Sequence, residues 1–277
     1  MAMCLDTHCH LDASEFDIDR ESVIDRAVAT GVAGVLIPAV QAKDFDAVKQ
    51  LAHHAAHQLP ATCYTLGIHP MYTPHAKEQD IALLKEAIQV ALDDPRFVGV
   101  GEIGLDYFVP ELDEKTQAYY FEEQLNLAEE FNLPVILHVR RSQDEILKAL
   151  RRKKIIGGIA HAFNGSFQQA ENFIKLNFVM GFGGAMTHPR ALQIRRLAKE
   201  LPAQSIVLET DAPDISPVWL SDSEHPRNEP GELPQISSEL AQIRGTLVSQ
   251  TQHICTQNTL RVIPRWRDLV DSIHPLN

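Results

Sequence analysis

Eight short apolar runs alternate with eight longer amphipathic segments along this chain of 277 residues, and this alternation restricts the fold more than any other feature. The apolar runs are rich in β-branched residues, which is typical of buried strands. They cover residues 3–8, 34–40, 61–68, 97–103, 135–139, 155–161, 178–182 and 206–210. The segments between them have helical apolar spacing and cover residues 19–30, 42–57, 79–93, 114–131, 143–152, 166–176, 189–200 and 234–246.

Strands that alternate with helices predict a parallel sheet with right-handed crossovers. Eight such units predict a closed (β/α)8 TIM barrel of the α/β class, for which about 250 residues is a typical length. We therefore expect residues 1–277 to form a single barrel domain, with a further helix near residues 250–262 packed outside it. An open doubly wound sheet is the alternative.

The charge and the cysteines restrict what the chain binds and where it works. Its net charge of −12 excludes a broad basic surface, so a nucleic-acid substrate would need local positive charge, which bound metal ions would supply. The four cysteines lack CxxC spacing, which argues against a disulfide framework and a structural zinc site. The sequence shows no secretory leader and no run of about 18 apolar residues. We expect a cytoplasmic protein without membrane contact or an obligate protein partner.

Side chains that bind metals or anions follow the predicted strands at the points where the strands end. They are His8, His10, His69, Glu102, Asp106, His138, Arg140, His161, Glu209 and Asp211. Residues i and i+2 of a strand face the same side, so His8 and His10 would point together while Cys9 points away. Barrel active sites lie at the carboxyl ends of the strands, and buried polar groups there are costly unless they are paired or bind metal. The sequence therefore predicts a metal centre at this end of the barrel.

The simplest such centre holds two divalent ions with Glu102 bridging them. The other ligands would be His8, His10 and Asp211 for one ion, and His138 and His161 for the second. Imidazole and carboxylate ligands suit Zn²⁺, Mn²⁺, Co²⁺ or Ni²⁺. Two ions would lower the pKa of a bridging water and stabilise the attacking and leaving oxygens, so the expected chemistry is hydrolysis. Glu102 and Asp211 are the candidate catalytic residues, with Asp211 orienting or deprotonating the water.

Two further residues are candidates for contact with the substrate. Arg140 lies two residues after His138 and would meet a phosphate at the same mouth. His69 would donate a hydrogen bond to a substrate oxygen. A nucleic-acid enzyme also needs aromatic or cationic groups around the mouth. The candidates in the loops are Tyr72, Tyr107, Phe108, Phe163, Trp219 and Arg227.

Six motifs follow one another along almost the whole chain, namely DTHCHLD, GIHP, VGEIGLDY, LPVILHVR, HAFNGS and VLETDAP. Together they resemble the signatures of the TatD family of metal-dependent deoxyribonucleases, which belong to the metal-dependent hydrolases with a (β/α)8 barrel. The resemblance implies a divalent-metal enzyme that acts from 3′ to 5′ on DNA. It also implies metal ligands at His8, His10, Glu102, His138, His161 and Asp211.

The sequence departs from the family pattern in one motif. Many members have His-Cys-Phe where this chain has His161-Ala162-Phe163, and Ala162 would face away from the site. The resemblance implies Mg²⁺, whereas four imidazoles favour a transition metal.

Three functions fit these observations. The first is a 3′-5′ deoxyribonuclease that acts on single-stranded DNA or on 3′ ends. The alternative is a metal-dependent hydrolase of a small ester, amide or phosphoester, because the same centre serves both. The third is a non-catalytic metal-binding barrel, against which the complete ligand set argues.

Overall fold

The computed structural model describes residues 3–221 and 226–273, and all its strands belong to one parallel sheet in the order β1 to β8. The strands are β1 (Cys4–Asp6), β2 (Val32–Pro38), β3 (Cys63–Leu66), β4 (Phe97–Asp106), β5 (Val135–Arg140), β6 (Gly158–Ala160), β7 (Phe178–Phe182) and β8 (Ile206–Leu208). Hydrogen bonds from Thr7 N to Leu208 O (3.1 Å) and from Asp211 N to His8 O (2.8 Å) join the first strand region to the last. The sheet is therefore a (β/α)8 barrel as predicted, and the open-sheet alternative is wrong.

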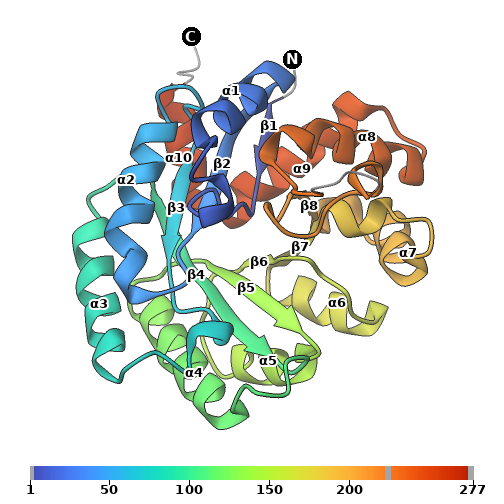
Figure 1. Ribbon diagram of the computed structural model, residues 1–277. Helices are drawn as coiled ribbons and strands as arrows, with labels where there is room; N and C mark the ends of the chain where they lie inside the picture. Colours follow the sequence, from blue (N-terminus) through green and yellow to red (C-terminus); the bar gives the residue numbers. More distant parts are fainter. Residues whose placement is uncertain (1–2, 222–225, 274–277) are drawn as a thin grey trace.

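The helices form a ring around the strands (Figure 1). They are α1 (Arg20–Thr30), α2 (Phe45–Ala55), α3 (Gln79–Ala91), α4 (Glu114–Glu130), α5 (Gln143–Leu150), α6 (Phe167–Lys175), α7 (Leu192–Glu200), α8 (Leu233–Arg244), α9 (Val248–Val262) and α10 (Pro264–Ile273). Short 3-10 turns follow several strands, among them η2 (Ala42–Asp44) after β2 and η3 (Pro70–Tyr72) after β3. Within the described residues, none of these helices combines the length and apolar character that a membrane crossing requires.

All eight predicted strands are present, but several are shorter at their carboxyl ends than predicted. The runs predicted to reach residues 8, 68, 161 and 210 end at Asp6, Leu66, Ala160 and Leu208. Beyond these ends, side chains bind some of the backbone groups, since Asp6 Oδ1 accepts from Thr210 N and Gln124 Oε1 accepts from Ile68 N. Other groups, such as His161 N, still donate to a carbonyl of a neighbouring strand. The chain leaves the ladder at these points and turns toward the barrel mouth.

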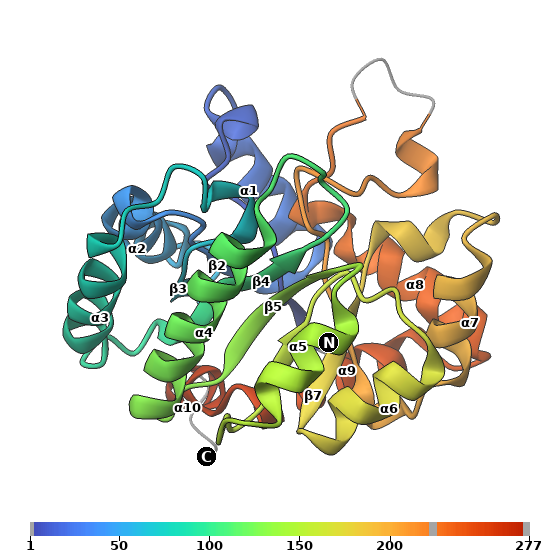
Figure 2. The ribbon, with the colours of Figure 1, turned by 90° about the horizontal axis from the view of Figure 1, so that it is seen from below.

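The barrel interior has an apolar lower layer. Each strand contributes one buried apolar residue to it: Leu5, Leu36, Cys63, Val98, Ile136, Ile159, Val179 and Val207. Helix α10 packs against this layer with Trp266, which is fully buried. Figure 2 shows α10 at the end of the barrel opposite the loops that follow β4 and β8. The apolar pattern did not predict α10, which closes the bottom of the barrel.

The residues two positions further along several strands are polar, because side chains on the same face of a strand recur with period two. His138 follows Ile136, His161 follows Ile159, and Glu209 follows Val207. On β7 the corresponding residue is Gly181, where a Cβ would lie 1.8 Å from Glu209 Oε2. The barrel therefore changes from apolar at the bottom to polar at the mouth within one side-chain layer.

The bottom closure generates a stability prediction. Trp266→Ala removes a fully buried side chain whose Nε1 donates to Ala61 O at 2.7 Å, so we expect the free energy of unfolding to fall by about 3–5 kcal/mol. Urea unfolding followed by circular dichroism measures the change. Arg267→Ala, on the exposed face of the same helix, is the control and should change it by less than about 0.5 kcal/mol. Equal stability of the two variants would contradict the role given to α10.

Candidate metal centre

Seven side chains meet at the mouth, around the carboxylate of Glu102. Glu102 lies on β4 and His138 on β5, whereas His8, His10, His69, His161 and Asp211 follow the ends of β1, β3, β6 and β8. The Glu102 side chain is 1% exposed, and all its ion-pair partners among the described residues are histidines. The fold thus brings together every residue that the sequence predicted as a metal ligand.

One group of ligand atoms lies on the Oε2 side of Glu102. His8 Nε2 is 3.1 Å from Glu102 Oε2, 3.2 Å from His10 Nε2 and 3.6 Å from Asp211 Oδ1. His10 Nε2 is 3.4 Å from Glu102 Oε2 and 3.8 Å from Asp211 Oδ1. Two atoms bonded at about 2.0–2.1 Å to one tetrahedral ion lie about 3.3 Å apart, so this spacing fits four ligands of one ion.

A second group lies on the Oε1 side of the same carboxylate. His138 Nδ1 is 3.0 Å and His161 Nε2 is 2.9 Å from Glu102 Oε1, and the two nitrogens are 3.3 Å apart. The two oxygens of Glu102 therefore face different histidine groups, an arrangement that suits a bridging carboxylate.

His69 also contacts Glu102, but its hydrogen bonds indicate a donor rather than a ligand. Its Nε2 lies 3.2 Å from Glu102 Oε1, and its Nδ1 accepts a hydrogen bond from Met71 N at 3.2 Å. Because Nδ1 accepts, the proton of the neutral ring resides on Nε2. Burial lowers the pKa of His69 to about 4, which keeps the ring neutral. His69 therefore presents an N–H to the cluster.

Asp106 orients His138 from the far side of the ring. Its Oδ2 lies 3.0 Å from His138 Nε2, and its Oδ1 accepts hydrogen bonds from Phe108 N and Val109 N. A proton held on Nε2 would leave the Nδ1 lone pair free to bind an ion beside Glu102. The sequence analysis missed this contact because Asp106 and His138 lie on different strands.

Two further buried carboxylates hold the backbone that carries the ligands. Asp6 binds His8 N and both the N–H and hydroxyl of Thr210, and so joins the ends of β1 and β8. Glu209 Oε1 accepts from Ala162 N, next to His161. Glu209 thus holds the backbone beside His161 rather than its imidazole ring.

The electrostatics of the cluster favour cations. Burial alone would lower the pKa of His161, but the charges of Glu102 and Asp211 outweigh it and raise the pKa to about 10. Burial likewise opposes protonation of His10, and Glu102 raises its pKa to about 9. Burial raises the pKa of Glu102, yet the imidazoles, His69 first, hold it well below its usual range. The ionised carboxylate thus attracts positive charge into a pocket of imidazole nitrogens, which is the environment that a divalent ion requires.

Cationic and aromatic groups rim the mouth, although fewer than predicted. Arg140, 48% exposed, lies with its guanidinium carbon 3.9 Å above the Phe108 ring, and Arg141 lies 4.6 Å from the same ring. Arg227 is paired with Asp19 at 2.7 Å. Phe163 is 1% exposed and packs against the barrel core, so it is unavailable for stacking and its prediction as a mouth residue was wrong.

Ser166 caps α6 and forms a capping box with Gln169. All four cysteines are buried and free of disulfides, as their spacing predicted.

Comparisons with known proteins point in the same direction as the geometry. Residues 5–264 match the family model described as TatD related DNase. A protein of Escherichia coli strain K12 named the uncharacterised metal-dependent hydrolase YjjV is 36% identical over 258 residues, which cover 92% of this chain and 95% of that protein. The crystal structure of YjjV, described as a TatD homologue, matches with a TM-score of 0.87 at 33% identity, covering 95% of this chain and 98% of that one.

A relative with a named activity is similar over a comparable length. A protein of Escherichia fergusonii named 3′-5′ ssDNA/RNA exonuclease TatD is 32% identical over 245 residues, which cover 87% of this chain and 91% of that protein.

The contact between Asp106 and His138 generates a prediction for metal affinity. Asp106→Asn retains an acceptor for Phe108 N and Val109 N but removes the charge beside His138 Nε2. We expect the affinity for Zn²⁺ to fall by about 10–100-fold, as measured by competition with a chromogenic chelator.

The matched control for this prediction is Asp113→Asn. Asp113 caps the start of α4, where its side chain accepts a hydrogen bond from Thr116 N and none from a residue of the cluster. Its affinity for Zn²⁺ should equal that of the unmodified protein. An unchanged affinity in Asp106→Asn would show that His138 needs no orienting partner or binds no metal.

Proposed function

We propose that this chain, which belongs to the family of TatD-related DNases, is a divalent-metal-dependent hydrolase that removes nucleotides from the 3′ end of single-stranded DNA. The family membership that the six motifs indicated is confirmed by the family match over residues 5–264. The observation that carries the proposal is the carboxylate of Glu102, whose two oxygens face two separate groups of histidine nitrogens.

We propose two ions per chain, held as the two groups around Glu102 indicate. One would be bound by His8, His10 and Asp211, and the other by His138 and His161, with Glu102 shared between them. Four imidazoles among the ligands favour Zn²⁺, Mn²⁺, Co²⁺ or Ni²⁺ over Mg²⁺. Bound ions would lower the pKa of a water molecule and polarise the phosphoryl group.

Asp211 is the residue best placed to take a proton from the attacking water. Its carboxylate makes only long contacts among the described residues, at 3.6–3.9 Å to histidine nitrogens. Its backbone has a φ of 59°, in the left-handed region, which turns the side chain back into the mouth after β8. An acceptor that no neighbouring donor occupies is free to orient and deprotonate water.

Two other side chains would bind the phosphate. His69 presents Nε2–H toward Glu102 and would donate to a phosphoryl oxygen that approaches the cluster. Arg140 contacts Asp106 only at 3.8 Å, so most of its donors face the mouth. A guanidinium binds two oxygens of one phosphate with matched geometry.

Hydrolysis of a small phosphoester is the second candidate. The observation that favours it is that Arg227 is paired with Asp19 and Phe163 is buried, which reduces the surface available for a long strand of nucleic acid.

We also propose that residues 1–277 form a single domain and that the protein is cytoplasmic. The four buried free cysteines support the cytoplasmic location.

The nuclease proposal predicts shortening of DNA from its 3′ end. Metal-stripped protein would be incubated with 5′-labelled single-stranded DNA after addition of Mg²⁺, Mn²⁺, Zn²⁺ or Co²⁺, and the products would be resolved on a sequencing gel. We expect a ladder that grows from the 3′ end only with metal. A phosphorothioate link at the 3′ terminus should block it.

Glu102→Ala is the control, because it removes the carboxylate shared by both histidine groups. Its activity should fall by at least about 10³-fold, the scale on which loss of a central charged group affects an electrostatic site. Bound metal with no shortening of DNA would move the assignment to a small phosphoester. An active Glu102→Ala protein would refute the centre itself.

Arg140 generates a separate kinetic prediction. Arg140→Gln removes a charge-assisted contact to phosphate, so kcat/KM on single-stranded DNA should fall by about 10–100-fold. Arg151→Gln, at the exposed end of α5, should leave it unchanged. Equal rates for both variants would rule out the phosphate contact.

A further inference from the structure

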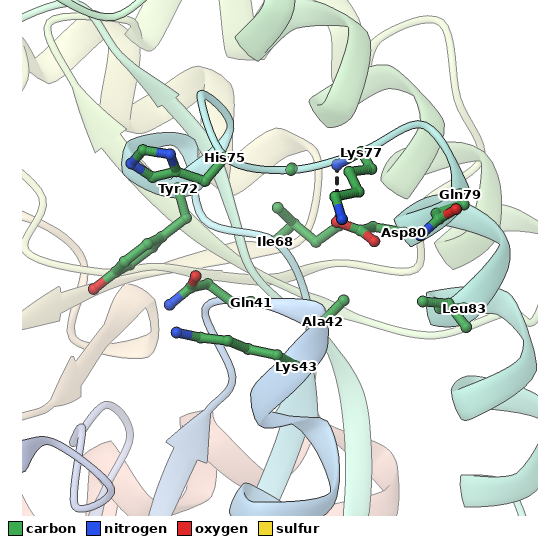
Figure 3. Close-up of a pocket in the computed structure, with 11 residues that line it drawn as sticks. Gln41, Ala42, Lys43, Ile68, Tyr72, His75, Lys77, Gln79, Asp80 and Leu83 are labelled. Carbon is green, nitrogen blue, oxygen red and sulfur yellow. Dashed lines mark hydrogen bonds between the residues drawn. The ribbon is translucent and has the colours of Figure 1, made fainter.

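A second concave site lies outside the histidine cluster, between the loops that follow β2 and β3. It is a cavity of about 290 Å³, and Figure 3 shows side chains from both loops and from the start of α3 around it. Its lining includes Lys43, Ile68, Tyr72, Lys77 and Leu83. We call this cavity the β2–β3 pocket.

The β2–β3 pocket adjoins the metal centre through Tyr72. The Tyr72 ring centroid is 6.2 Å from that of His69, and His69 Nε2 is 3.2 Å from Glu102 Oε1. Tyr72 is 37% exposed, so one aromatic side chain lies both beside the cluster and on the wall of the pocket. A strand held at the cluster would therefore reach this pocket with an adjacent unit.

The lining combines an aromatic surface with cations. Ile68 and Leu83 contribute apolar surface beside Tyr72, and Lys43 and Lys77 contribute ammonium groups. Neither lysine forms an ion pair with a described residue. The lysines that do are Lys49, Lys85, Lys148 and Lys153. The Asp80 carboxylate accepts a hydrogen bond from Lys77 N at 2.9 Å, drawn as a dashed line in Figure 3. In a chain of net charge −12, two lysines at one cavity that form no ion pair within residues 3–221 and 226–273 are a local site for an anion.

We propose that the β2–β3 pocket binds a nucleotide of the substrate strand next to the one that is cleaved, with its base against Tyr72 and the phosphates on either side of it at Lys43 and Lys77. Proteins hold single-stranded nucleic acid by this combination of an aromatic face and cationic side chains. The volume is close to the lower end of the range for small-ligand sites, which suits one nucleotide. A bare phosphate would need only the lysines, whereas the aromatic and apolar walls fit a base. The inference rests on the proposed nuclease function.

The stacking contact is tested by binding of a 5′-fluorescein-labelled ten-nucleotide thymidine strand with phosphorothioate links. Fluorescence anisotropy would give its Kd for the metal-loaded full chain. Tyr72→Ala should raise the Kd by about 5–100-fold, whereas Tyr72→Trp, which keeps a face for stacking, should stay within about threefold. Tyr119→Ala is the matched control, since Tyr119 is 44% exposed on the outer helix α4 and should not affect binding.

The phosphate contacts are tested by the salt dependence of the same Kd. Loss of one phosphate contact lowers the slope of log K against log salt by about 0.7 for a single strand. Lys43→Ala and Lys77→Ala should each lower the slope by about that amount. Lys175→Ala, at the end of α6 that precedes β7, should leave the slope unchanged.

The outcomes separate this inference from the proposed function. If the unmodified protein shortens DNA while the Tyr72, Lys43 and Lys77 variants bind with unchanged Kd and slope, the pocket assignment is overturned and the nuclease function stands. If the unmodified protein neither binds nor shortens DNA, both are overturned. A rise in Kd for Tyr72→Ala that Tyr72→Trp prevents supports the pocket.

Discussion

The buried carboxylate of Glu102 is the interaction on which the rest of the mouth depends. Five imidazoles contact it, and its side chain is 1% exposed. An ionised carboxylate out of water is costly unless cations or hydrogen-bond donors surround it. The neighbouring side chains meet this requirement in two ways, since His69 donates from Nε2 and the remaining nitrogens suit positive charge between them and the carboxylate. Histidines from the ends of strands across the barrel therefore contact, and stabilise, one carboxylate.

The barrel separates the groups that stabilise it from the groups that act. Its lower interior is filled by one apolar residue from each strand and is closed by Trp266 of α10. The next layer is polar, and the carboxylates of Asp6, Asp106 and Glu209 bind backbone or imidazole groups there. A polar layer of this kind contributes little hydrophobic stabilisation, which comes instead from the apolar bottom and from the larger core between the strands and the surrounding helices. Loops at the mouth are therefore free to vary without loss of the core.

The sequence predicted the barrel and the residues of the cluster because both depend on periodicity. Alternation of strands and helices specifies the barrel, and a strand carries its side chains inward at every second position, as with His138 above Ile136. Features that depend on contacts between distant segments were not predicted. The orientation of His138 follows from Asp106 on the neighbouring strand, and the burial of Phe163 follows from packing against Phe173 of α6. Helix α10 was missed because it follows α9 after a single intervening residue.

The charge of the chain restricts how a polyanionic substrate would be held. With a net charge of −12, long-range attraction is absent, and screening removes most interactions beyond about 10 Å. Binding must then come from short-range groups at the mouth. Arg227 is already paired with Asp19, whereas Arg140 and Arg141 both lie against the Phe108 ring and are exposed. The same acidic surface would repel a polyanion elsewhere, so contact would be confined to the mouth and the β2–β3 pocket beside it.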